Sequence, residues 1–203
     1  SGGYQVFLLN GSYNVTVSGD GFATPLTKSV TISDGTNAKL DFRMDEAGAV
    51  PPIVDLNGDE EGIDLSVVIP EGAEEPTSVL DPSALTIIDP DSTYLYGAKI
   101  YFDARPDGAN ESLELSVSGT NLTASFSEQM GCITISGTGT IAEYETAISS
   151  LKYFNSNGSC DLMSERTVLI SVYDGVFWSE EATLSISIEP TNLPNMTVHE
   201  MTA

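Results

Sequence analysis

The residues of this chain that could bind a ligand are acidic side chains at turns between short apolar segments. Three such turns are Pro70-Glu71-Gly72, Asp89-Pro90-Asp91 and Val172-Tyr173-Asp174-Gly175. Thirty acidic residues against seven basic ones give a net charge of −23, and such a charge repels itself in a compact state unless cations lie among the carboxylates. Because calcium takes oxygen ligands, the turns predict divalent-metal binding. An ordinary solvated acidic surface is the alternative.

Two further acidic loops carry oxygen-bearing side chains at spacings that suit a cation. Asp55-Leu56-Asn57-Gly58-Asp59 resembles a loop cage, but Glu60 stands where an EF-hand needs glycine. We expect a solvated acidic turn there. Asp103, Asp107 and Glu111 form a second candidate cage, for which a plain turn between strands is the alternative.

The sequence lacks the groups of residues that usually catalyse reactions. The only histidine, His199, has no companion base, nucleophile or metal ligand nearby in the sequence. A pair of carboxylates, which glycoside hydrolysis requires, occurs in any acidic chain and discriminates nothing. We therefore expect no enzymatic activity. The aromatic group Tyr173, Phe177 and Trp178 could stack on a sugar ring, with packing inside the fold as the alternative.

Glycosylation acceptors and cysteines indicate the compartment. Asn-x-Ser/Thr acceptors are more frequent than the roughly two expected by chance, and they occur at Asn10, Asn14, Asn110, Asn121, Asn157 and Asn195. Cys132 and Cys160 lie in no CxxC or Cys/His cluster. We expect them to form a disulfide, with two buried free thiols as the alternative. The sequence therefore predicts an extracellular or cell-surface protein with N-linked glycans.

The charge also excludes two classes of partner. With a pI near 4.1, the chain repels the phosphate backbone of nucleic acids and anionic membrane surfaces. Its apolar runs are too short to span a bilayer, so we expect no nucleic-acid partner and no direct membrane insertion. The expected partners are neighbouring modules of the same chain or further copies of it, and glycans are another candidate. We expect the chain to be a segment of a larger protein.

Apolar and polar residues alternate along most of the chain, which is typical of half-buried strands. The pattern begins at Tyr13, Val15 and Val17. Residues 51–190 continue it as roughly seven or eight strands. These strands are expected around Ile63/Leu65/Val67/Ile69, Leu85/Ile87, Ala98/Ile100/Phe102, Leu113/Leu115/Val117, Leu122/Ala124/Phe126, Ile133/Ile135, Val168/Ile170/Val172 and Leu184/Ile186/Ile188. Residues 140–151 differ, because a capping box and helical apolar spacing predict one short helix there.

Residues 51–190 resemble a cadherin-like β-sandwich repeat of the kind found in large microbial and algal surface proteins. The segments Pro52-Ile53-Val54-Asp55-Leu56-Asn57-Gly58, Ile88-Asp89-Pro90-Asp91-Ser92 and Glu111-Ser112-Leu113 carry this resemblance. In cadherin repeats, calcium lies between successive modules. The resemblance implies Glu71 as the acid near the first strand, Asp89 and Asp91 as the DxD pair, and Asp174 in the xDxG turn. The acidic linker and Leu-Asp-Arg-Glu segment of the family are not kept.

Residues 4–44 resemble the second half of a carboxypeptidase regulatory-like domain, a transthyretin-like sandwich, through a β-hairpin pattern around Asn10-Gly11-Ser12. The whole chain is thus expected to be all-β, with tandem antiparallel β-sandwiches of which the second is cadherin-like with one short helix. The expected boundaries are 1–46 for the partial first domain, 47–52 for a linker, 53–190 for the cadherin-like domain and 191–203 for a linker and the start of a following module.

These expectations define one functional hypothesis and one rival. The hypothesis is a non-catalytic structural or adhesive segment of a large modular extracellular glycoprotein, stiffened by calcium, that builds a fibre, sheath or cell-surface adhesin. The rival is a carbohydrate-binding or accessory module of a secreted enzyme, in which Trp178 and its neighbours would contact sugar.

Overall fold

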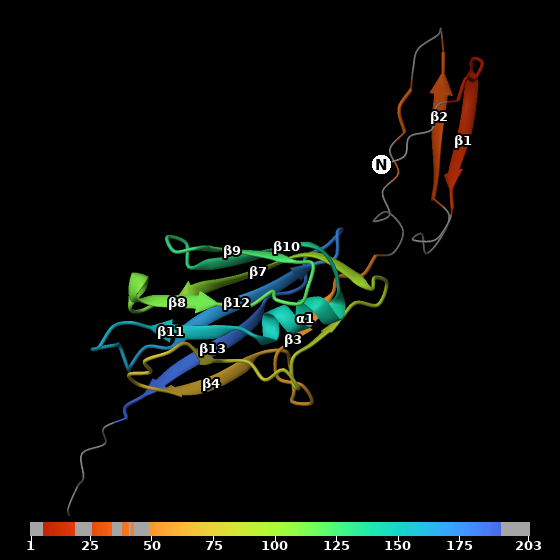
Figure 1. Ribbon diagram of the computed structural model, residues 1–203. Helices are drawn as coiled ribbons and strands as arrows, with labels where there is room; N and C mark the ends of the chain where they lie inside the picture. The colour runs from red at the N-terminus through yellow and green to blue at the C-terminus, as the bar shows by residue number, and fades with distance from the viewer. Residues whose placement is uncertain (1–5, 19–25, 34–37, 41, 43–48, 192–203) are drawn as a thin grey trace, which may run out of the picture. The chain divides into compact units, whose positions relative to one another are not determined.

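The structure is a computed structural model that describes residues 6–18, 26–33, 38–40, 42 and 49–191. Strands make up 46% of it and helices 7%, which confirms the all-β prediction. The chain divides into two compact units, Ser1–Val50 and Pro51–Ala203 (Figure 1).

The described part of the first unit contains a β-hairpin. Strands β1 (Gly11–Val17) and β2 (Leu26–Ile32) pair antiparallel, with Asn14 opposite Ser29. Along β1, Tyr13, Val15 and Val17 are half-buried and their neighbours are exposed, as the alternation predicted. The other face carries hydroxyl pairs across the strands, such as Thr16 and Thr27 at 2.8 Å. Such pairs fix the register of the hairpin.

The second unit contains three sheets that share one core (Figure 1). The largest has the strand order β4-β13-β12-β7-β10-β9, the second the order β5-β11-β8, and the third pairs β3 with β6. The strands are β3 (Ile53–Asp55), β4 (Leu65–Pro70), β5 (Thr77–Ser78), β6 (Thr86–Ile88), β7 (Tyr94–Ala104), β8 (Glu111–Glu114), β9 (Thr123–Ser127), β10 (Cys132–Thr140), β11 (Lys152–Asn155), β12 (Arg166–Tyr173) and β13 (Ala182–Glu189). A 3-10 helix, η2 (Gly108–Asn110), precedes β8.

Three features of this unit differ from the expected antiparallel sandwich. Strand β4 runs parallel to β13, with Leu65 opposite Leu184, so the sheet is not purely antiparallel. The short strands β3, β5 and β11 were not predicted, because so few residues give no readable alternation. Strand β8 ends at Glu114, and Val117 of the expected strand lies in the loop after it.

The core lies between the six-stranded sheet and the two smaller sheets. Ile100, Ile135 and Ile170 of the large sheet are at most 1% exposed. Side chains of the smaller sheets complete the same cluster, including Tyr153, whose ring meets that of Phe102 edge-on at a centroid separation of 6.2 Å. Burial of such apolar area is the main favourable contribution to folding.

Helix α1 (Ile141–Ser149) confirms the predicted short helix. The Thr140 hydroxyl accepts a hydrogen bond from Glu143 N at 3.3 Å, and Glu143 Oε2 accepts one from Thr140 N at 2.8 Å. This reciprocal capping box satisfies amide groups that a helix start leaves unpaired. Tyr144 and Ile148 anchor the helix in the core at 0% exposure. In the described part of the chain, no helix has the length and hydropathy required to cross a membrane.

Candidate functional site

The acidic residues expected to bind calcium lie at opposite ends of the second unit. Strands β7 and β12 are antiparallel, with Gly97 opposite Tyr173, so the turn before β7 and the turn after β12 meet at one end of the sheet. The first turn carries Asp89 and Asp91, and the second carries Asp174. Glu71 follows β4, whose last residue lies opposite Glu189 at the end of β13. The structure therefore brings three of the four acids to one end and places Glu71 at the other.

Asp89 is the most informative of the three acids. Its Oδ1 accepts hydrogen bonds from Asp91 N at 3.1 Å and Ser92 N at 2.9 Å. Its Oδ2 is buried and has no hydrogen-bond partner. Burial raises the pKa of Asp89, and the nearby Asp91 carboxylate adds to this against the lowering effect of the backbone hydrogen bonds. A buried, unpartnered carboxylate oxygen is costly, and a bound cation would remove that cost.

Asp174 has a role in its own turn. Its Oδ1 accepts hydrogen bonds from Val176 N and Phe177 N, both at 2.6 Å, and the side chain is buried at 7% exposure. This is an Asx-type arrangement that holds the β12–β13 turn. At the opposite end, Glu71 is half-buried and its backbone N donates to Glu189 O at 2.7 Å.

These acids fit only part of a calcium shell. No three His, Cys, Asp or Glu side chains among the described residues lie close enough together to hold a metal ion. Calcium takes six to eight oxygens, so the free oxygen of Asp89 suits a cation while the remaining ligands would have to be backbone, water or a neighbouring module. The loop that begins at Asp55 is a turn, because Asp55 Oδ1 accepts hydrogen bonds from Asn57 N at 2.9 Å and Gly58 N at 3.2 Å.

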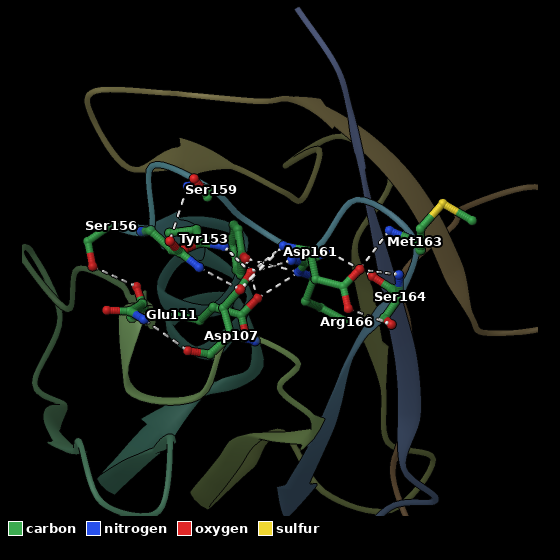
Figure 2. Close-up of polar contacts among 12 residues, drawn as sticks. Asp107, Glu111, Tyr153, Ser156, Ser159, Asp161, Met163, Ser164 and Arg166 are labelled. Carbon is green, nitrogen blue, oxygen red and sulfur yellow. Dashed lines mark hydrogen bonds and ion pairs between the residues drawn. The ribbon is translucent and has the colours of Figure 1, made fainter.

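Asp107 and Glu111 of the second candidate cage do meet, and the cation between them is the guanidinium of Arg166 (Figure 2). Arg166 Nη2 donates to Asp107 Oδ2 at 2.7 Å, and Arg166 Nε donates to Glu111 Oε1 at 2.6 Å. The side chains of Arg166 and Glu111 are both 0% exposed, and that of Asp107 is 8% exposed. Asp103 takes no part in these ion pairs.

Neighbouring groups form hydrogen bonds with the remaining donors and acceptors of this buried cluster. Tyr153 donates its hydroxyl to Glu111 Oε1 at 2.6 Å, and Arg166 Nη1 donates to Ser164 O at 2.7 Å. Asn155 and Asn157 donate their amide groups to the two oxygens of Asp107, each at 2.8 Å. Such complete satisfaction is what a buried charge requires.

The electrostatic consequence is a lowered pKa for Asp107. Burial by itself would raise the pKa of Asp107, but hydrogen bonds from Asn155, Asn157, Asp161 N and Arg166 outweigh it and lower the pKa. Burial and the hydrogen bond to Glu111 raise the pKa of Tyr153, so this phenol remains a donor. Arg166 was not predicted as a site residue, and its one signal was a basic residue at the start of a strand with no other charged residue, in a chain with few basic residues.

The predicted Cys132–Cys160 disulfide is wrong for this fold, because both cysteines are free. Cys132 lies on β10, beside β9 at one margin of the large sheet. Cys160 lines a small cavity with Ile69 and Glu71, at the margin formed by β4. Strands β13, β12 and β7 separate β4 from β10, so the two sulfur atoms are too far apart to bond. Burial and the nearby Glu71 carboxylate raise the pKa of the Cys160 thiol.

The glycosylation acceptors differ in accessibility. Asn10, Asn14, Asn110 and Asn121 are exposed, and Asn195 lies outside the described residues. Asn157 is half-buried, and its Nδ2, the atom that would carry a glycan, donates to Asp107 at 2.8 Å. The Nδ2 atoms of the exposed Asn110 and Asn121 also donate hydrogen bonds, to Asp107 O at 3.3 Å and to Glu143 Oε1 at 3.4 Å. Asn10 and Asn14 therefore suit modification in the folded state best, and the half-buried Asn157 suits it least.

The aromatic group lies on the outer face of the large sheet. The rings of Tyr173 and Trp178 stack with centroids 5.2 Å apart, and Lys99 Nζ lies 4.6 Å from the centre of the Trp178 ring. Trp178 and Phe177 remain 40% and 41% exposed. The Trp178 ring, which the sugar-binding hypothesis requires, is thus already packed against Tyr173 and Lys99.

Comparison with known proteins adds no family. Neither the protein-family models nor the curated proteins contain a match to this chain.

Proposed function

We propose that this chain is a non-catalytic structural or adhesive segment of a larger modular extracellular glycoprotein, in which calcium bound by acids at the ends of the modules restricts bending. The modules would assemble in a fibre, a sheath or a cell-surface adhesin. The cadherin-like and transthyretin-like resemblances belong to this proposal.

The observation that carries the proposal is the path of the chain through the second unit. The chain enters at Ile53, which pairs with Ile88 directly before Asp89. It leaves at Glu189, which pairs with Pro70, the residue directly before Glu71. The two ends of the unit are therefore its two connections; the first carries three acids of the implied calcium set and the second carries one, Glu71. A module with this path can be joined end to end with others, and acids at each joint can share an ion with a neighbour.

The charged groups inside the unit support a structural role. Asp107, Glu111 and Arg166 are buried and are satisfied by each other and by surrounding donors. A catalytic acid or base has to reach a substrate, whereas these side chains are occupied in tying η2, β11 and β12 together. They act as an internal clamp between the sheets.

The extracellular part of the proposal gives a glycosylation prediction. If the chain is secreted from cells that perform N-glycosylation, we expect glycans at the exposed Asn10 and Asn14 and an unmodified Asn157, whose amide nitrogen is held by Asp107. Glycopeptide mass spectrometry of the folded, secreted chain measures the occupancy of each acceptor. High occupancy at Asn157, or no glycan at any acceptor, would contradict the prediction.

The mechanical part of the proposal can be tested by small-angle X-ray scattering of the whole chain. We expect calcium to make the connection between the two units stiffer, which narrows the distribution of interatomic distances relative to the chain in chelator. The variant Asp89→Asn/Asp91→Asn should show no such change, because asparagine keeps an acceptor oxygen but removes the charge. Identical scattering of the unmodified chain in calcium and in chelator would refute the stiffening.

A further inference from the structure

Strand β9 has a free edge that differs from the other edge of the same sheet. Both β4 and β9 are outermost strands. Strand β4 is bounded by Asp64 and Glu71 and ends at Pro70, and proline and charge are the usual protections of an edge strand against further pairing. Strand β9, Thr-Ala-Ser-Phe-Ser, contains neither. No charged residue occurs between Glu114 and Glu128.

The core behind β9 is open. Phe126 and Ala124 lie opposite Ile133 and Ile135 of β10. Those isoleucines are 2% and 1% exposed, whereas Ala124 is exposed and Phe126 is 39% exposed. A groove of about 350 Å³ separates β9 from β8, the edge strand of the neighbouring sheet, and Leu113 and Leu115 line its other side. The sheets therefore leave core-facing apolar side chains uncovered along this margin.

We propose that β9 is an interface at which two copies of this chain pair edge to edge, with the two β9 strands antiparallel and centred on Ser125. Two-fold symmetry places the same patch of both copies in contact. In this register, Phe126 of each copy lies beside Ala124 of the other, so that a large side chain meets a small one over the open groove. Ser125 meets its own counterpart on the outer face.

The uncharged edge and the two-fold register favour a second copy as the occupant. Copies of a chain with a net charge of −23 repel one another, so they can approach only where charge is absent. The uncharged run between Glu114 and Glu128 provides such a surface, and the register centred on Ser125 sets Glu128 opposite Leu122 of the partner copy, away from the partner's own Glu128. Backbone pairing supplies the affinity, as in other cases of strand addition.

The test measures self-association of the whole chain, made in bacteria so that no glycan at Asn121 covers β9, in chelator. Sedimentation velocity over about 10 µM to 1 mM, a range that covers the dissociation constants of weak interfaces, should show a monomer–dimer equilibrium. Ser125→Lys should raise the dissociation constant at least about tenfold, because two lysines would face each other. Lysine also lowers the overall repulsion between copies, so general charge cannot explain such a loss. Ser66→Lys, on the exposed face of β4, is the matched control and should leave the dimer intact.

A second readout fixes the register. With Cys132 and Cys160 replaced by serine, Ser125→Cys should form a covalent dimer on oxidation, whereas Ser66→Cys should not. A chain that stays monomeric throughout, a dimer that survives Ser125→Lys, or equal cross-linking of both cysteine variants would overturn the proposal. The inference rests on the proposed structural role, but the assay contains no calcium, so the interface and the calcium-stiffened joint can fail independently.

Discussion

Replacing Arg166 with methionine is expected to lower the free energy of unfolding of the second unit by about 3–5 kcal/mol. The guanidinium lies between Glu111 and Asp107 at 2.6 and 2.7 Å, with both Arg166 and Glu111 fully buried. Methionine fills a similar volume but leaves the two carboxylates without their cation. Urea unfolding followed by fluorescence of Trp178, the only tryptophan, measures the loss in this unit.

Two comparisons separate the charge of Arg166 from its packing. Arg166→Lys keeps the charge but loses the planar fork, so it should recover only part of the stability. The double variant Arg166→Met/Glu111→Leu removes the fully buried pair together and should be more stable than Arg166→Met alone. A loss below about 1 kcal/mol for Arg166→Met, the range of exposed ion pairs, would show that the cluster is not a clamp.

The same cluster makes stability depend on pH in a defined direction. The pKa of Asp107 is lowered in the folded state. The contribution of Asp107 to the free energy of unfolding is therefore fully present above the ordinary aspartate pKa of about 3.9, and it is lost as the pH falls through the lowered value. In Arg166→Met the pKa of Asp107 should rise towards its unfolded-state value, so the acid-induced loss of stability from this residue should become smaller and should be complete at a higher pH than in the unmodified chain. Urea unfolding of both chains at a series of acidic pH values measures the difference.

Replacing Tyr144 with alanine is expected to cost about 3–5 kcal/mol, as for other large core aromatics. Tyr144 is 0% exposed and its hydroxyl donates to Gly137 O at 2.7 Å, so it joins α1 to β10. Tyr144→Phe keeps the ring and loses only this hydrogen bond, which should cost about 1 kcal/mol. The difference between the two variants in denaturant unfolding isolates the ring. Equal losses for both would contradict the role of the ring as the anchor of α1.

Local patterns in the sequence were sufficient for most of the secondary structure. Val168, Ile170 and Val172 alternate along a strand with every second side chain buried, and β12 lies there. The capping box at Thr140 and Glu143 placed the start of α1 at the correct residue. These signals are readable because each depends only on residues close together in the chain.

Pairing between distant segments could not be read in this way. The parallel contact of β4 with β13 joins Leu65 to Leu184, and nothing in either strand's own alternation states the direction of its neighbour. The disulfide prediction failed for the same reason, because spacing along the chain did not show that Cys132 and Cys160 lie at opposite margins of the sheet.

The candidate sites also differ in whether neighbouring residues in the sequence reveal them. The turn positions of Asp89 and Asp174 could be predicted because acids at turns are recognisable from neighbouring residues, and calcium binding there stays a prediction. Arg166 was missed because its partners, Asp107 and Glu111, are more than fifty residues away. A buried ion cluster is a property of the assembled core, and its members look like ordinary surface charges in the sequence.

The central claim, calcium binding by the acids at the end where the chain enters the second unit, is tested most directly by thermal unfolding in calcium and in chelator. A ligand that binds only the folded state stabilises it by about 2.7 kcal/mol at a hundred times its dissociation constant, which corresponds to roughly 5–11 °C for a unit of this size. The account predicts such a rise for the unmodified chain and for Asp81→Asn, a turn acid outside the implied calcium set. It predicts none for Asp89→Asn/Asp91→Asn. The same melting temperature with and without calcium would contradict the claim.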